Sequence, residues 1–105
     1  MMTRKEAEML IAGIVAGEVP LDRKKHFTDK MLADGFGIQD VFGVLRAPSS
    51  MTAPQLDEEH RNYKVEIVGK DMDGRRTKVV VGLRSEGPCV GITIMLARVR
   101  ARGKP

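Results

Sequence analysis

A histidine stands among cationic residues in the stretch DRKKHFTDKMLADG, residues 22–35. The stretch is predicted to form a short helix, in which His26 and Lys30 are four positions apart and so lie on one face. Histidine can take up or release a proton near neutral pH, because its unperturbed pKa is about 6.5. The pair therefore indicates proton transfer beside an anionic group. The alternative interpretation is that His26 is a surface or capping residue on a solvated face.

Metal-independent cleavage of RNA is one chemistry that such residues could perform. It needs a base for the 2′-hydroxyl proton, an acid for the leaving 5′-oxygen, and cations that stabilise the charge on the phosphate. We expect His26 to be the general acid or base, with Lys30 and Arg84 as phosphate ligands. Arginine suits that role because its planar fork can bind two phosphate oxygens at once. The candidate substrate-binding residues are Arg61, Tyr63, Lys64, Lys78 and Thr93.

Each of these candidates also has an ordinary structural interpretation. Lys64 and Lys78 could simply belong to a solvated sheet face, and Tyr63 could be half-buried packing instead of a stacking or proton-donating group. A site could also be completed by His60 and Arg61, which lie in the loop before Tyr63.

Composition bounds the class of protein. The chain has 105 residues, a formal net charge of +4 and one cysteine, Cys89, so we expect one domain over residues 1–105 and no internal disulfide. The positive charge favours polyanionic partners without identifying them. No signal segment and no apolar run of about 18 residues is recognisable, which predicts a cytoplasmic protein without membrane contact.

Familiar catalytic motifs are absent from the sequence. It contains no phosphate-binding loop of the form Gly-x-x-x-x-Gly-Lys-Ser/Thr, no Gly-x-Ser-x-Gly and no His-Glu-x-x-His. The spacings of cysteine and histidine that bind zinc are absent as well. We therefore expect neither a metal nor a cofactor.

Hydrophobic periodicity predicts an α+β fold. Two to three helices are expected over about residues 4–46, the first opened by a capping box at Thr3 and Glu6 and the third running from Ile38 to Arg46. A loop with a short edge strand is expected over about 47–62. Three or four antiparallel strands follow over about 63–99, with one face packed on the helices.

The strand register follows from which side chains must be buried. The predicted inward residues are Val65 and Ile67, Val79 and Val81, and then Val90, Ile92, Ile94 and Leu96. Pairing of the first two sets favours a loop of three or five residues, closed by Gly74 at positive φ in a three-residue hairpin with a bulge. The other face would hold Lys64, Glu66, Lys78, Val80, Gly82, Arg84, Gly91, Thr93 and Met95.

The order of these features resembles a family of small bacterial proteins of unknown function that carries an H-A-x-x-R-M motif. The matching positions are His26, Lys30 and Met31; Gly35 or Gly37; Ile38, Asp40 and Val41; Leu45 and Pro48; and the ITI sequence around Thr93. The chain differs in having Phe27 for the alanine and Lys30 for the arginine, and it lacks the arginine that precedes the glycine.

That family is similar to the RelE-like and MqsR-like toxins of toxin–antitoxin pairs. The resemblance implies a RelE-like or barnase-like architecture, and it implies a metal-independent endoribonuclease that cleaves mRNA, including mRNA on the ribosome. It also implies a cognate antitoxin as partner. Two alternatives stay open: a non-catalytic module of the same fold that binds nucleic acid or an acidic protein, and a structural dimer.

Overall fold

Apart from the two-residue strand β1, the helices precede the strands along the chain in an α+β arrangement, as the periodicity predicts. The computed structural model describes residues 1–97. The elements are α1 (Arg4–Val15), β1 (Leu21–Asp22), α2 (Lys25–Ala33), α3 (Ile38–Arg46), β2 (Ser50–Met51), β3 (Gln55–Asp57), β4 (Asn62–Lys70), β5 (Arg76–Leu83) and β6 (Cys89–Leu96). The predicted end of the last strand, residues 98–99, lies outside the described residues.

The sheet is larger than the sequence predicts, and it is mixed. Its six strands run in the order β1-β6-β5-β4-β2, and β3 also pairs with β4. The pair β1–β6 is parallel, whereas the other pairs are antiparallel. The three long strands β4, β5 and β6 are antiparallel as predicted, whereas the six-strand count exceeds the predicted three or four and the parallel strand β1 was not predicted. The strands β1, β2 and β3 have two or three residues each, which is too short for an alternation of apolar and polar residues to be recognised in the sequence.

The β4–β5 hairpin has the predicted register. Val65 pairs with Val81 and Ile67 with Val79, and all four side chains are buried. The turn has Gly74 at φ 81°, where alanine would be strained. Its N–H donates to the carbonyl of Asp71 at 3.0 Å, and the N–H of Asp71 donates to the carbonyl of Arg75 at 3.0 Å. This is the predicted three-residue loop with a bulge.

The β5–β6 pair departs from the prediction at a β-bulge. Val80 pairs with Thr93 but Val81 pairs with Gly91, so Ile92 is an extra residue in β6. The bulge reverses the alternation on its N-terminal side. Gly91 is therefore buried, not exposed, and the predicted inward position of Val90 and Ile92 is wrong.

The helices begin and end where local chemistry dictates. At the start of α1, the Thr3 Oγ1 accepts the Glu6 N–H at 3.1 Å, and the Glu6 carboxylate accepts the Thr3 N–H at 2.8 Å, which is the predicted capping box. At the start of α3, Asp40 accepts the Gly37 N–H at 2.8 Å. The other oxygen of Asp40 accepts the Met72 N–H at 2.9 Å, which ties α3 to the β4–β5 turn.

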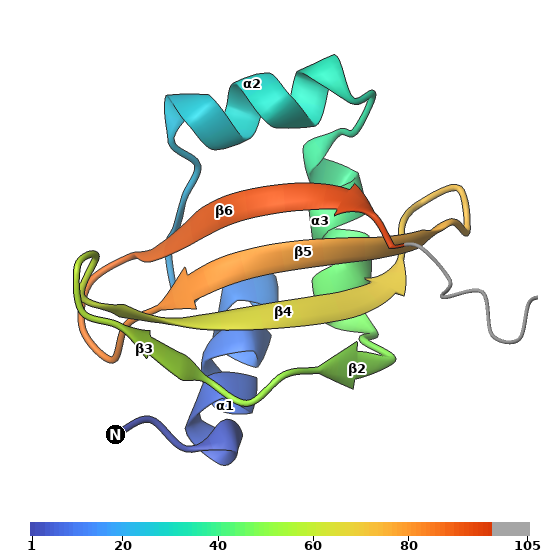
Figure 1. Ribbon diagram of the computed structural model, residues 1–105. Helices are drawn as coiled ribbons and strands as arrows, with labels where there is room; N and C mark the ends of the chain where they lie inside the picture. The colour runs from blue at the N-terminus through green and yellow to red at the C-terminus, as the bar shows by residue number, and fades with distance from the viewer. Residues whose placement is uncertain (98–105) are drawn as a thin grey trace, which may run out of the picture.

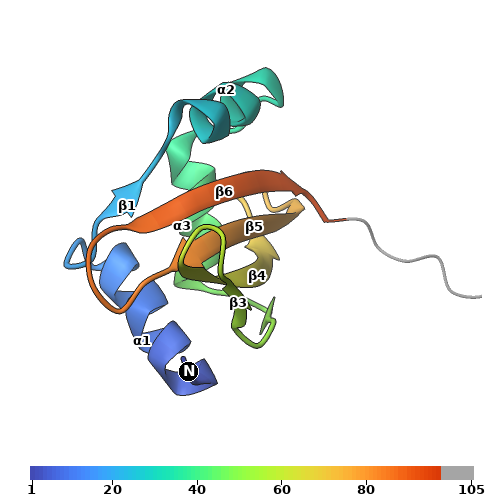
Figure 2. The same cartoon turned by 60° about the vertical axis from the view of Figure 1, so that its left-hand side comes forward.

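One hydrophobic core joins all three helices to one face of the sheet. The buried residues come from α1 (Ala7, Ile11, Ile14), α2 (Phe27, Met31), α3 (Val41, Val44, Leu45) and strands β4, β5 and β6 (Val65, Ile67, Val79, Val81, Leu83, Cys89, Ile94). Figures 1 and 2 show α1 and α3 behind the sheet and α2 along its β6 edge. Within residues 1–97, no helix covers the opposite face, which we call the open face.

Candidate functional site

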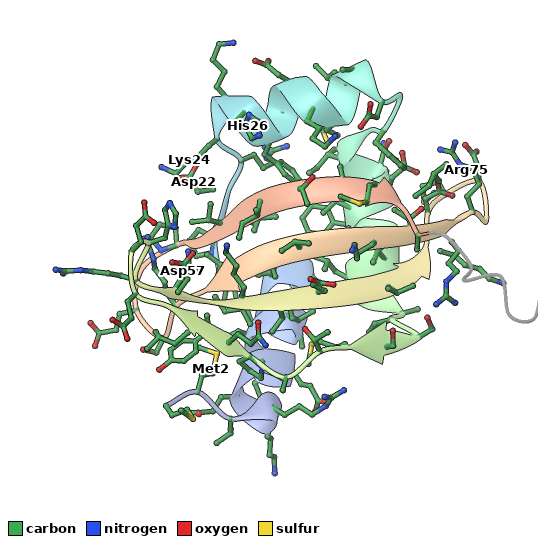
Figure 3. All side chains as sticks on the ribbon, viewed as in Figure 1. Met2, Asp22, Lys24, His26, Asp57 and Arg75 are labelled. Atoms are coloured by element: carbon green, nitrogen blue, oxygen red, sulfur yellow. The ribbon has the colours of Figure 1, made fainter. Side chains whose placement is uncertain are left out.

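A hollow of about 350 Å³ lies on the open face, between the start of α2 and the β3–β4 hairpin. Its lining residues are Lys24, Asp57, His60, Asn62, Lys64, Arg84, Val90 and Ile92, and we call this the His60 pocket. Figure 3 shows Asp57 at this end of the sheet, below Lys24 and Asp22, whereas Arg75 lies at the opposite end. Three of the lining side chains are cations and one is a carboxylate, so the pocket favours an anionic ligand.

His60 is held by Asp57 within the turn that joins β3 to β4. The ring Nδ1 of His60 lies 2.9 Å from Asp57 Oδ2, and the His60 N–H donates to Asp57 Oδ1 at 3.3 Å. The carboxylate therefore fixes both the backbone and the ring. The side chain of Asp57 is 15% exposed, whereas that of His60 is 62% exposed, so the ring remains accessible to a ligand.

The charge on Asp57 determines the tautomer of His60. The hydrogen bond from His60, together with the nearby ammonium of Lys64, lowers the pKa of Asp57 to about 2, so the carboxylate is ionised and can only accept hydrogen bonds. Nδ1 of His60 must then carry the proton that is shared with Asp57. In the neutral ring, Nε2 presents a lone pair, which is the state a general base requires.

The cations of the pocket differ in how far they are already neutralised. Lys64 Nζ lies 3.2 Å from Asp57 Oδ2, and Lys24 Nζ lies 3.6 Å from Asp22. Arg84 Nη2 donates to the carbonyl of His60 at 3.1 Å, so this guanidinium contacts a neutral group and holds the histidine turn. The buried Nε of Arg84 has no hydrogen-bond partner among residues 1–97.

The pocket combines these polar groups with an apolar wall. Val90 and Ile92 line it because the β6 bulge turns them to the open face. Asn62 is only 4% exposed and also lines the pocket. A ligand can therefore meet charge, a buried amide and a hydrophobic surface in one place.

Two of the predicted site residues, Lys64 and Arg84, meet in this pocket, together with His60, which the sequence suggests could complete a site. The predicted catalytic pair lies elsewhere, on α2. His26 is exposed on that helix, outside the pocket lining, and Lys30 forms an ion pair with Asp34 at 3.2 Å. Figure 3 shows His26 on α2, farther from the sheet than Lys24 in this view.

The remaining predicted residues are dispersed. Tyr63 packs partly buried against the core side, as its position in β4 predicts. Arg61 is exposed in the β3–β4 turn, with φ 54°. Lys78 lies 3.5 Å from Glu66 in an ion pair on the open face, and Thr93 has a buried hydroxyl without a partner among residues 1–97.

Sequence reasoning gave His60 only a secondary place and did not single out Asp57, Asn62 or Lys24. The sequence signal for His60 and Asp57 is their Asp-x-x-His spacing, which suits a turn in which the carboxylate accepts hydrogen bonds from both the backbone and the ring of the histidine. Asn62 and Lys24 had no comparable signal, because the pocket depends on how α2 sits beside β6.

Other hollows lack this combination of groups. One of about 430 Å³ lies between α1, α3 and residues 48–51, where Arg4 and Glu8 pair at 3.7 Å. Another, of about 390 Å³, is lined mainly by Met1, Met2, Met9 and Tyr63. The part of the chain described here holds no cluster of three or more histidine, cysteine, aspartate or glutamate side chains suited to a metal ion.

No helix within residues 1–97 has the length and apolar character needed to cross a bilayer. A scan against protein-family models, a search of curated proteins and a search of solved structures each give no match to this chain.

Proposed function

We propose that the protein is a metal-independent endoribonuclease whose reaction takes place in the His60 pocket. The observation that carries the proposal is the contact of 2.9 Å between His60 Nδ1 and the ionised Asp57, beside the cations Lys64 and Arg84. The general acid or base expected at His26 is thereby reassigned to His60, because it is His60 that shares a pocket with phosphate-binding side chains.

The proposed reaction begins with His60 as base. Nε2 takes the proton of a ribose 2′-hydroxyl, and the 2′-oxygen attacks the adjacent phosphorus as the bond to the 5′-oxygen breaks. The products are a 2′,3′-cyclic phosphate and a 5′-hydroxyl end. Asp57 is a positioning residue in this scheme, since it orients the ring and stabilises the imidazolium that forms.

The cations of the pocket supply the other requirements. Arg84 is suited to bind the phosphate oxygens, since its guanidinium has no carboxylate partner among the described residues. Lys64 and Lys24 carry ammonium protons and can stabilise negative charge that grows in the transition state. The proton for the leaving 5′-oxygen comes from an ammonium group of the pocket or from the imidazolium.

A toxin role within a toxin–antitoxin pair, with mRNA as substrate and a cognate antitoxin as inhibitor, rests on the sequence resemblance. The arrangement that supports it is a sheet with helices on one face and an open face that carries the cationic pocket, which suits a RelE-like architecture. An antitoxin would then inhibit by covering the pocket with acidic side chains.

Binding without cleavage is the second candidate, and a specific observation favours it. The pocket holds one histidine, and two of its three cations are already within 4 Å of a carboxylate. A nuclease of this kind usually uses one group as general base and a second as general acid. A phosphate-binding module needs neither group.

A cleavage assay in excess chelator distinguishes the two candidates. We expect cleavage of RNA with a 2′,3′-cyclic phosphate on the product, and no cleavage when the cut site carries 2′-deoxyribose. Tight binding of both substrates without any product would contradict the nuclease and support the binding module.

A further inference from the structure

The amide of Asn62 is a buried polar group that the proposed cleavage reaction leaves without a role. Asn62 is 4% exposed, and its Oδ1 has no hydrogen-bond partner among residues 1–97. A buried acceptor without a partner is destabilising, and most buried polar atoms in native proteins are hydrogen-bonded to protein, water or ligand. Asn62 lines the His60 pocket, so a ligand is the available partner.

The sheet makes room for this amide at Gly82. A Cβ atom at position 82 would lie 2.5 Å from Asn62 Nδ2 and 2.7 Å from its Cγ, closer than real Cβ contacts. The asparagine side chain therefore lies over the backbone of β5, in space that only glycine leaves free. This close approach fixes the position of the amide in the lining of the pocket.

The surroundings of the amide match a flat, partly apolar ligand better than a bare anion. Phosphate oxygens at neutral pH accept hydrogen bonds, so they cannot satisfy Asn62 Oδ1, which needs a donor. The unpartnered Nε of Arg84 adds a donor to the same pocket, and Val90 and Ile92 add a hydrophobic wall. A nucleobase offers a donor and an acceptor on one edge and two apolar faces.

We propose that Asn62 reads the base of one nucleotide, with adenine as the best fit, and so sets the sequence preference of the pocket. This inference rests on the proposed function, because it takes RNA as the ligand. An asparagine amide can pair with adenine through two hydrogen bonds, accepting from N6 and donating to N7. Lys64 lines the same pocket and its side chain is 46% exposed, so it can rotate to admit the base while His60 keeps its contact with Asp57.

The test measures binding of single nucleotides, which cannot be cleaved. The probes are adenosine, guanosine, cytidine and uridine 5′-monophosphates and ribose 5-phosphate, titrated into the full chain while the Asn62 side-chain amide resonances are followed by NMR. We expect adenosine monophosphate to bind at least about fivefold more tightly than uridine monophosphate or ribose 5-phosphate, and to shift the Asn62 resonances. Equal affinity for all five probes, or base-dependent binding that leaves Asn62 unshifted, would overturn the inference.

Two variants separate the amide from the phosphate contacts. Asn62→Ala removes the amide, and Gly82→Ala displaces it through the 2.5 Å contact. Both should lose the preference for adenosine monophosphate while keeping the affinity for ribose 5-phosphate, whereas Lys64→Ala should weaken every probe alike. A preference that survives in both alanine variants would contradict the role of Asn62.

These outcomes are independent of the cleavage proposal. Base-selective binding that depends on Asn62, in a protein that never cleaves RNA, would support the base-reading role and reject the nuclease. Cleavage without any base preference at the cut site would support the nuclease and reject the base-reading role of Asn62.

Discussion

Replacing Gly91 with alanine tests the β6 bulge, on which the composition of the His60 pocket depends. A Cβ atom at position 91 would lie 3.2 Å from three ring carbons of Phe27, where carbon atoms normally approach to about 3.5–4.0 Å. Phe27 is 1% exposed, so its ring has no solvent to move into. Gly91 does not have positive φ, so its backbone conformation does not itself penalise alanine.

The sign of the effect distinguishes the two possible registers. With the bulge, overpacking against Phe27 should lower the free energy of unfolding by about 1–3 kcal/mol. Without it, Gly91 would face solvent, and alanine should stabilise the strand by about 0.5–1 kcal/mol. Urea denaturation measures this as a midpoint lowered by about 1 M for a chain of this size.

A double-mutant cycle shows whether Phe27 is the cause. Gly91→Ala should cost less in a Phe27→Leu background, because the smaller side chain leaves room for the new methyl group. A midpoint that is unchanged or raised by Gly91→Ala would refute the bulge and return Val90 and Ile92 to the core.

Three further predictions concern the open face and the core. The Asp57 carboxyl should titrate in NMR with a midpoint near pH 2. Since this pKa lies below the ordinary value of 3.8, the stability that the carboxylate contributes should be complete above about pH 4 and lost between pH 4 and 2. A midpoint at the ordinary value would contradict the contact with His60. Val81→Asp should unfold the domain in thermal denaturation because it buries an unpaired charge, whereas Lys78→Asp should leave the domain folded. Equal loss of stability in both variants would mean that the two sheet faces are misassigned. Binding of a short single-stranded RNA should weaken with salt at a log–log slope of about −2 if all three pocket cations contact phosphate, and a slope of zero would exclude phosphate contact.

The long elements were predictable because their signals are local. The capping box at Thr3 and Glu6 fixes the start of α1, and the alternation in β4 and β5 fixes which faces meet. The odd length of the β4–β5 loop follows from the pairing of buried residues, since only an odd number of loop residues brings Val65 opposite Val81. These features depend on neighbouring residues and on one requirement, that apolar side chains share a core.

The rest depends on contacts that the sequence does not encode locally. In β6, strict alternation fails because Gly91 must face the ring of Phe27 on α2, about 60 positions earlier in the chain. The same packing of α2 places Lys24, at the start of that helix, beside the His60 pocket. The cationic neighbours of His26 are adjacent to it in the sequence, whereas the contact of His60 with Asp57 exists only once the β3–β4 turn is formed.

The initial rate of RNA cleavage in excess chelator, compared between His60→Ala and His26→Ala, tests the central claim most directly. We expect His60→Ala to lower the rate by about 10²–10⁴-fold, as loss of a positioned proton-transfer group does, and His26→Ala to stay within about twofold of the unaltered protein. Both side chains are exposed, so neither substitution should unfold the domain, which circular dichroism can verify. The opposite pattern, with activity lost in His26→Ala and retained in His60→Ala, would contradict the assignment of catalysis to the His60 pocket.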